Sequence, residues 1–281
     1  MILVTGATGT VGRELITQLT ASGTRVRGMS RYPERAGLPA DVEMVRGDLG
    51  RPETLGPAVD GAERVFLLAG GPDGPMHEAN LVAAAMRAGV RHIVKLSVLA
   101  AGHDGDDPIT RWHLAGERTI EASGLAWTFL RPGAFMANAL MWADTIREQG
   151  TVYAPYTTAR TAPIDPFDIA AVAARVLTQT GHEGRAYSLT GPELLSPSDE
   201  VDRLGAALGR PLQLVEVPPE AARRGMVESG MPGELADAVM ATLAMAGSGH
   251  AAVVLPTVEE VTGRRARTFD DWVACHVGAF R

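Results

Sequence analysis

Short apolar runs alternate with helical patterns through the first half of the chain. Two of these runs, Val65–Leu68 and His92–Leu96, are almost continuously apolar, which is typical of strands that are covered on both faces. The pattern predicts strands at Ile2–Thr5, Thr24–Met29, Val42–Arg46, Arg64–Ala69, Arg91–Ser97 and Ala126–Arg131. It predicts helices between them at Thr10–Ser22, Pro75–Ala88 and Ile109–Ser123. This alternation predicts an α/β fold with a doubly wound parallel sheet.

The pattern becomes looser after about Pro132, and helical segments dominate. Three residues are expected to cap helices. Asp168 would cap a helix from Ile169 to Gln179, and Ser196 would cap a helix that runs through Leu208. Thr268 would cap a last helix, Phe269–Val277. Two further segments begin with proline near their first turn, Pro218–Glu228 and Pro232–Ala246. We therefore expect residues 1–132 to form the sheet core. Residues 133–281 are expected to form a smaller, mostly helical lobe that is interleaved with it.

Glycines recur at positions 6, 9 and 12, between the first expected strand and the first expected helix. Gly6 permits a tight turn, Gly9 lets the backbone approach a pyrophosphate, and Gly12 allows the helix to pack closely on the strand. The helix N-terminus then presents free N–H groups and a positive dipole to the phosphates. The loop predicts a dinucleotide-binding region within residues 1–132, with Thr8, Thr10 and Val11 as further contacts. The alternative is a purely structural turn.

The end of the second expected strand indicates which dinucleotide binds. NAD sites place an acidic residue there, whereas this chain has Arg31 and no acid before Glu34. A guanidinium at this point can bind a 2′-phosphate, with Ser30 and Arg35 adding a hydroxyl and a second charge. The sequence therefore predicts NADP(H); the alternative is a solvated surface arginine.

Composition excludes several functional classes. The 281 residues carry a formal net charge of −7, and a nucleic-acid binder normally has a basic surplus. The single cysteine allows no internal disulfide, and no Cys/His cluster has zinc spacing, so we expect no metal site. No apolar run approaches the length of a membrane span, and the N-terminus has no signal-peptide pattern. We expect a cytoplasmic protein, monomeric or homodimeric, that acts on a small molecule.

Several motifs together resemble one known family. They are Val4-Thr-Gly-Ala-Thr-Gly-Thr-Val-Gly12, Arg46-Gly-Asp-Leu49, Lys95-Leu-Ser97, Phe129-Leu-Arg-Pro-Gly133, Ile164-Asp-Pro-Phe-Asp-Ile-Ala170 and Gly205-Ala-Ala-Leu-Gly-Arg-Pro211. Over nearly its whole length the chain resembles the NmrA-like branch of the atypical short-chain dehydrogenases/reductases. The resemblance implies a Rossmann fold and NADP(H). The branch includes NADPH-dependent quinone reductases as well as cofactor-sensing regulators.

The Tyr-x-x-x-Lys motif of ordinary members is absent. The positions four residues after the four tyrosines are Ala36, Thr157, Arg160 and Gly191. Lys95 lies inside the fifth expected strand, where it cannot replace the motif's lysine by position. By its place on a helix, the motif corresponds to His113 and Glu117, which share one helix face. An imidazole titrates near neutrality, and a nearby carboxylate would favour its protonated form, so His113 is a candidate proton donor. The alternative is a partly exposed histidine beside a solvated glutamate.

Strand ends supply the remaining candidates, because ligands of open α/β sheets collect at the carboxyl edge. Ser97 ends the fifth expected strand and is a catalytic candidate, although a hydrogen bond to backbone or cofactor fits it better. Asp48 and Leu49 either contact the adenine or, in the case of Asp48, cap the Arg51–Val59 segment. The fourth strand's end supplies further expected cofactor contacts: Leu68, Ala69 and Gly70.

The segment after the sixth expected strand supplies the expected substrate pocket. By resemblance, Pro132 runs beside the nicotinamide and Phe135 begins the pocket. Met136 and Trp142 would add soft apolar surface, and Asn138 a polar handle; the alternative for each is a place in the core. Two functions follow. The chain is either an NADPH-dependent reductase of a small apolar quinone, enone or carbonyl, or a non-catalytic NADP(H) sensor with a protein partner.

Overall fold

A seven-stranded parallel sheet forms the centre of the molecule. The computed structural model describes residues 1–39, 42–103, 105–249 and 252–281. The strand order is β3-β2-β1-β4-β5-β6-β8, and every pairing within it is parallel. The strands are β1 (Ile2–Val4), β2 (Val26–Ser30), β3 (Glu43–Arg46), β4 (Arg64–Leu67), β5 (His92–Leu96), β6 (Ala126–Pro132) and β8 (Arg185–Leu189). The predicted doubly wound α/β fold is confirmed, with the order reversing between β1 and β4.

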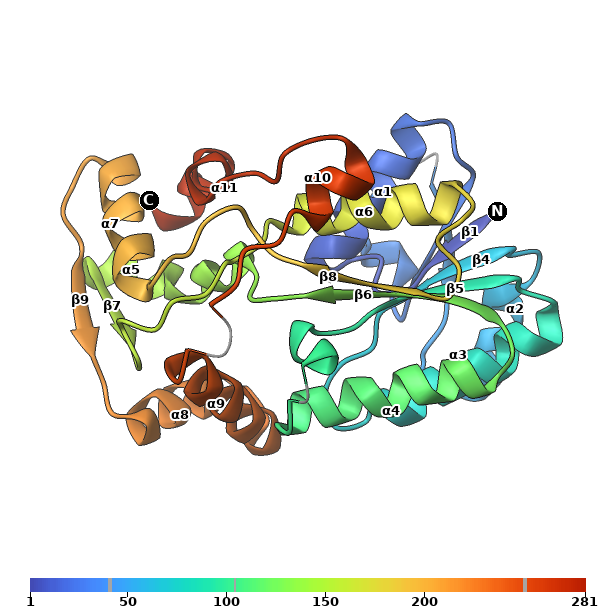
Figure 1. The fold of residues 1–281 in the computed structure, drawn as a ribbon, viewed down its shortest axis with the longest axis horizontal. Helices are drawn as coiled ribbons and strands as arrows, with labels where there is room; N and C mark the ends of the chain where they lie inside the picture. The colour runs from blue at the N-terminus through green and yellow to red at the C-terminus, as the bar shows by residue number, and fades with distance from the viewer. Residues whose placement is uncertain (40–41, 104, 250–251) are drawn as a thin grey trace.

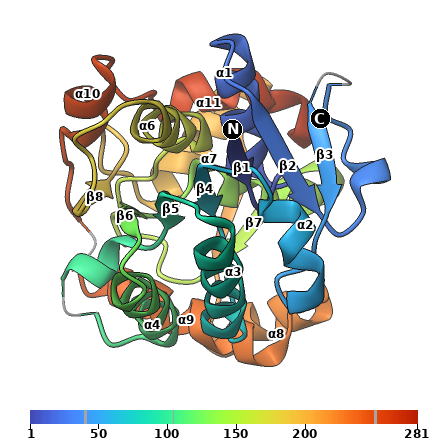
Figure 2. The same ribbon diagram turned by 90° about the vertical axis from the view of Figure 1, so that its right-hand side faces the viewer.

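Helices cover both faces of this sheet (Figure 2). One face carries α1 (Thr10–Ala21), α6 (Pro166–Thr178) and α10 (Thr257–Thr262); the other carries α2 (Leu55–Val59), α3 (Gly74–Ala88) and α4 (Pro108–Ala122). Each layer encloses its own apolar core. In β4, Phe66 packs into the α1/α6 core while Val65 and Leu67 pack into the α3/α4 core. Side chains alternate across a strand, so this double burial explains why apolar residues stand at successive positions in β4 and β5.

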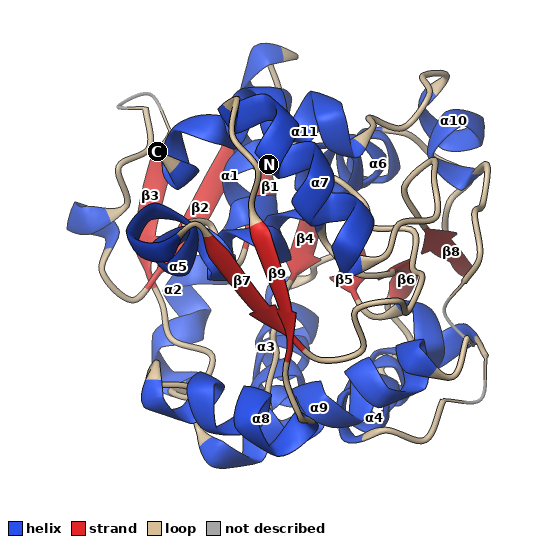
Figure 3. Cartoon of the chain, turned by 90° about the vertical axis from the view of Figure 1, so that its left-hand side faces the viewer, coloured by secondary structure: helices blue, strands red, loops and turns tan. Residues whose placement is uncertain are grey.

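The second half of the chain extends beyond the carboxyl ends of the sheet strands (Figure 1). The two-stranded parallel sheet of β7 (Thr151–Ala154) and β9 (Gln213–Glu216) lies there, next to further helices (Figure 3). Those helices are α5 (Ala143–Gln149), α7 (Pro197–Leu208), α8 (Pro219–Glu228), α9 (Gly233–Gly247) and α11 (Phe269–His276). Trp272, Phe269 and Phe280 centre a third core between them. The sequence pattern missed β7, β8 and β9. The last of the large sheet's strands, β8, shows how closely the two halves interleave.

Two of the three predicted helix caps are present. The Ser196 and Thr268 side chains each accept a hydrogen bond from the backbone three residues on and form a capping box. The prediction for Asp168 is wrong. Helix α6 begins at Pro166, and Asp165 caps it by accepting a hydrogen bond from the Phe167 N–H at 2.9 Å. Proline is suited to the first helical position, so the helix starts one turn earlier than the apolar pattern indicated.

Asp168 is instead a buried carboxyl within the first turn of α6. Its Oδ2 accepts a hydrogen bond from the Arg267 N–H at 2.7 Å, and burial raises the pKa of this carboxyl to about 6. Because its native pKa exceeds the value of 3.8 in an unconstrained chain, the native state binds more protons between these two pH values. The free energy of unfolding should therefore decrease by about 2–3 kcal/mol as the pH rises from 4 to 6.

Urea unfolding at a series of pH values measures this effect. Asp168→Asn keeps a neutral side chain that can still accept the Arg267 N–H, so this variant should lack the decrease. Asp202→Asn changes an exposed carboxylate of α7 and serves as the matched control. An equal decrease in all three proteins would show that other groups cause it.

Candidate active site

The glycine loop connects β1 to α1 in a tight turn. Gly6 adopts a φ of +61°, a conformation that disfavours any other residue. A Cβ atom on Gly12 would lie 2.1 Å from the Gly6 carbonyl oxygen, so only glycine fits where α1 approaches the loop. Thr5 Oγ1 accepts a hydrogen bond from the Leu68 N–H at 2.8 Å and ties the ends of β1 and β4 together. The loop therefore lies where the strand order reverses, the usual place for a ligand in this fold.

This loop fits a dinucleotide pyrophosphate. Gly9 caps α1 without any side-chain hydrogen bond, and the first turn of α1 carries no acidic residue. The N–H groups of that turn and the positive end of the helix dipole are therefore open to an anion. Thr8, Gly9 and Thr10 are exposed, as a contact surface requires, whereas Val11 is buried and can contribute only its backbone. Contact of these residues with a cofactor remains a prediction.

The expected 2′-phosphate region surrounds the end of β2. Arg31 is exposed, and no described residue forms an ion pair with it. The Arg35 guanidinium lies over the Tyr32 ring, 5.6 Å from its centre, and Ser30 Oγ accepts a hydrogen bond from the Tyr32 N–H at 3.1 Å. Arg13 of α1 bonds to the carbonyls of Thr8, Ala36 and Gly37, which fixes the glycine loop against this segment.

The neighbouring strand ends complete the expected cofactor groove. The Asp48 carboxylate accepts a hydrogen bond from the Gly50 N–H at 2.9 Å, and it does not cap α2, whose N-cap is Thr54. The Leu49 carbonyl accepts a hydrogen bond from Asn80 Nδ2 at 2.9 Å. The Leu68 side chain packs under Gly6. These contacts set the shape of the loops after β3 and β4, where we expect the adenine and the nicotinamide ribose.

His113 belongs to a buried polar group with Lys95 and Glu78, which the sequence analysis did not predict. The Lys95 side chain of β5 forms an ion pair with Glu78 of α3, and Lys95 Nζ lies 3.2 Å from His113 Nδ1 on α4. Lys95 lies in β5, outside the helix on which the motif's lysine would stand, yet its side chain contacts the histidine that occupies the motif's place. The side chain points toward α3 and α4 and reaches the helix that carries His113. Lys95 is the one lysine among 26 basic residues, and this rarity was the feature of the sequence that could have marked it as a site residue.

The interpretation of Glu117 as the carboxylate partner of His113 is also wrong. Arg131 of β6 bonds to both oxygens of Glu117, at 3.0 and 2.6 Å, and Ser97 Oγ donates to one of them. Burial and the Lys95 cation together lower the pKa of His113 to about 3. His113 is accordingly neutral, and the Ser97 and Glu117 side chains join α4 to the ends of β5 and β6. The predicted catalytic roles of Ser97 and Glu117 have no supporting contact here.

The expected substrate residues lie in different surroundings. Met136 is 1% exposed and packs with Ile146, Val152 and Trp272 in the third core, so its assignment to a pocket is wrong. Trp142 packs partly against that core, and Asn138 is exposed. Phe135 is half-buried, and its backbone pairs with Ile164. Pro132 ends β6 at the carboxyl edge of the sheet, as expected, and its contact with a nicotinamide stays a prediction.

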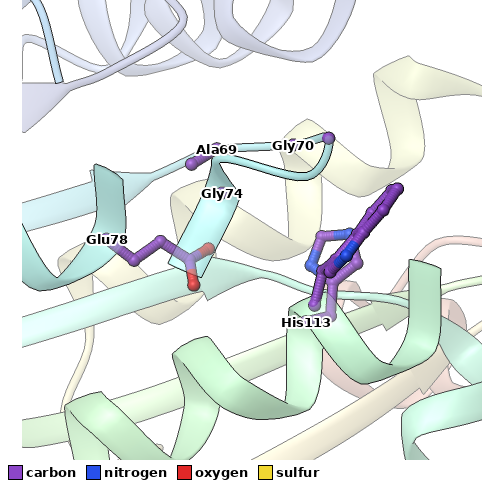
Figure 4. A pocket seen from close by; sticks show the side chains of 7 residues that line it. Ala69, Gly70, Gly74, Glu78 and His113 are labelled. Atoms are coloured by element: carbon purple, nitrogen blue, oxygen red, sulfur yellow. The ribbon is translucent and has the colours of Figure 1, made fainter. Parts of the chain in front are cut away.

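A small cavity of about 10 Å³ lies between the loop after β4 and helix α4 (Figure 4). It is lined by Ala69, Gly70, Gly71, Gly74, Glu78, Trp112 and His113. His113 thus faces the same loop that we expect to border the cofactor. Within the described residues, no group of three or more His, Cys, Asp or Glu side chains is arranged to hold a metal ion. No described helix has the length and apolar character of a membrane span.

Comparison with known proteins identifies the family. Residues 6–180 match a family model described as NAD(P)H-binding. The chain is 45% identical to a (4-alkanoyl-5-oxo-2,5-dihydrofuran-3-yl)methyl phosphate reductase of Streptomyces griseus and 41% identical to an NAD(P)H azoreductase of Xenophilus azovorans. Both alignments cover 100% of this chain and 99% of the relative.

A solved structure of a related enzyme has the same fold. The NADPH-dependent quinone oxidoreductase of Escherichia coli, complexed with NADPH, superposes with a TM-score of 0.86 at 26% identity. The match covers 98% of this chain and 99% of that one. The names of these relatives describe enzymes, not the cofactor sensor that the sequence left open. The chain therefore belongs to the NAD(P)H-binding family, in the NmrA-like branch of the atypical short-chain dehydrogenases/reductases, and is an NAD(P)H-dependent oxidoreductase.

Proposed function

We propose that the protein reduces a small conjugated acceptor, such as a quinone, an enone or an azo compound, and that His113 donates the proton. The observation that carries this proposal is the place of His113. Its Nδ1 is held by Lys95, and its ring faces the cavity beside Ala69, Gly70 and Gly71. That cavity lies at the carboxyl edge of the sheet, on the side where the glycine loop would hold the cofactor.

The acceptor class is supported by what the relatives' substrates share. The compound named for the Streptomyces griseus relative has a ring double bond conjugated to carbonyl groups, and azo compounds and quinones are also conjugated electrophiles. Addition of a hydride to any of them leaves negative charge on an oxygen or nitrogen atom. A neutral imidazole N–H is a suitable donor to such an atom because it can stabilise the charge as it develops.

The residues of the chain have separate roles in this proposal. Gly6, Gly9 and Gly12 would admit the pyrophosphate, and Arg31 the 2′-phosphate. When bound, the reduced nicotinamide supplies the hydride. Glu117, held by Arg131 and Ser97, anchors α4 one turn beyond His113 and so keeps that side chain at the cavity. The chain thereby places a proton donor without the Tyr-x-x-x-Lys motif.

An anaerobic assay of NADPH oxidation tests the proposal. The panel pairs conjugated acceptors (a benzoquinone, an acyl butenolide and an azo dye) with an isolated aldehyde of similar size. We expect turnover with at least one conjugated acceptor and much slower turnover with the aldehyde. Tight NADPH binding without reduction of any conjugated acceptor would contradict the proposal.

A further inference from the structure

Three ionisable side chains from three elements meet beneath the candidate site. Lys95 of β5 is 0% exposed and Glu78 of α3 is 1% exposed, and the two form an ion pair. The Lys95 ammonium also reaches His113 Nδ1, at 3.2 Å, on α4. Within the described part of the chain, nothing hydrogen-bonds His113 Nε2. The chain of contacts therefore runs from a buried carboxylate to an imidazole whose other nitrogen is free.

Stability alone gives a weak reason for this arrangement. Burying two charges is costly, and an apolar pair of similar volume is often as stable or more stable. The chain uses arginine for 25 of its 26 basic residues, yet a lysine occupies this site. An arginine guanidinium keeps its protons under all ordinary conditions, whereas a buried lysine can release one. The residue type thus favours a group that exchanges protons.

Two further features shape the surroundings of this pair. A Cβ atom on Gly116 would lie 1.4 Å from Glu78 Oε2, so the glycine in α4 makes room for the carboxylate. Glu78 and His113 both line the cavity of about 10 Å³, which has room for about one water molecule. Glu78 Oε2 has no hydrogen-bond partner among the described residues and is available to accept a proton.

Burial and charge act in opposite directions on the pKa values of this group. Burial lowers the pKa of Lys95 and raises the pKa of Glu78, and their mutual attraction opposes both changes. Two more carboxylates act on the group, Asp107 at the start of α4 and Glu117 within that helix. Asp107 acts weakly to raise the pKa of His113. Glu117 acts to raise the pKa of Lys95. An ammonium can only donate hydrogen bonds, so a protonated Lys95 beside Nδ1 places the proton of the neutral ring on Nε2.

We propose that Glu78, Lys95 and His113 form a buried proton relay, in which Lys95 both sets the tautomer of His113 and replaces the proton that His113 donates. This inference rests on the proposed function. It assigns Lys95 as the residue that positions and resupplies the His113 proton, and Glu78 as the positioning residue that keeps Lys95 protonated.

The electron pair of the acceptor's π bond moves to oxygen or nitrogen as hydride arrives, and that atom takes the Nε2 proton. The Nε2–H bond breaks while an Nδ1–H bond forms with a proton from Lys95 Nζ. Lys95 becomes a neutral amine and His113 its other neutral tautomer. The cycle closes when Nε2 takes one proton from water, which leaves hydroxide, while the Nδ1 proton returns to Lys95 Nζ across the 3.2 Å contact. This restores the Nε2–H tautomer and the ammonium together, and the Glu78 carboxylate stays beside Lys95 as its counter-ion.

Nitrogen NMR of the ¹⁵N-histidine-labelled protein, without cofactor or substrate, tests the tautomer. In the parent chain we expect His113 to be neutral at pH 7, with Nε2 protonated and Nδ1 unprotonated. The double variant Lys95→Met/Glu78→Gln replaces both buried charges together, which avoids leaving either one unpaired. In this variant the tautomers should mix, and the His113 pKa should rise only in part, because burial, the larger cause of its low value, remains after the ammonium is gone.

Steady-state kinetics test the proton supply. In the double variant kcat should fall about 10–100-fold with KM for the acceptor unchanged, since His113 is still present but Lys95 no longer orients and replaces its proton. In the parent chain kcat should decrease at high pH, where the Lys95 amine has no proton to give. Glu78→Gln keeps Lys95 but removes the carboxylate that raises its pKa, so this decrease should begin at a lower pH.

Each outcome decides one question. A parent His113 that carries its proton on Nδ1, or a double variant with the parent kcat and pH profile, would overturn the relay. If the double variant does not fold, the shift of the pH profile in Glu78→Gln decides, and an unshifted profile would overturn it. Failure of every acceptor would overturn the proposed function and leave the NMR test of the tautomer intact.

Discussion

Replacing His113 with alanine is expected to lower kcat about 10²–10⁴-fold, the usual contribution of a positioned general acid. The loss should be larger for an enone than for a quinone. A reduced quinone leaves a stabilised phenolate that water can protonate, whereas an enolate or a hydrazine anion needs a nearby donor. NADPH affinity should not change, because His113 lies on α4 and not in the glycine loop. Single-turnover kinetics together with NADPH titration separate the two quantities.

A matched histidine variant controls for general effects of the substitution. His182→Ala removes an imidazole near the amino edge of the sheet, where His182 contacts Tyr187 and Thr128, away from the candidate site. It should retain the parent kcat. If His113→Ala also retained the parent kcat with every acceptor, His113 would not be the donor, and protonation by water would explain turnover.

Replacing Arg31 with alanine is expected to raise the Kd for NADPH about 10–100-fold and to leave the Kd for NADH unchanged. The magnitude follows from the loss of hydrogen bonds to a charged group, about 1.5–3 kcal/mol. Arg31 is exposed at the end of β2 without an ion-pair partner among the described residues, so its removal should leave the fold intact. Fluorescence titration with both cofactors measures the two constants.

Arg25→Ala is the matched control, because it removes the same charge just before the opposite end of β2. Arg25 lies 3.8 Å from Glu43 and its side chain is 78% exposed, so little depends on it. Equal loss of affinity in both variants would indicate a general charge effect. Equal affinities of the parent chain for NADPH and NADH would contradict the predicted preference for NADPH.

The local pattern of the sequence was sufficient for six of the seven strands of the large sheet, and it predicted the nucleotide loop. Glycines at 6, 9 and 12 between a strand and a helix have few structural uses, and the apolar runs of β4 and β5 could only be strands with two covered faces. Two helix caps were also readable, since Ser196 and Thr268 act on their own helices. A helix cap depends only on residues three or four positions away in the chain, so the sequence alone determined these two caps.

Only the tertiary structure decided the partners of the polar side chains. Glu117 lies one helical turn from His113, yet it bonds to Arg131, whose place next to α4 depends on the sheet register. Lys95, Glu78 and His113 come from three separate elements, and no spacing in the sequence relates them. Met136 packs in a core with residues of β7 and α11, and the sequence pattern did not predict that these elements pack together. Periodicity determines which face of an element is buried, but the packing of elements determines which charges share that buried space.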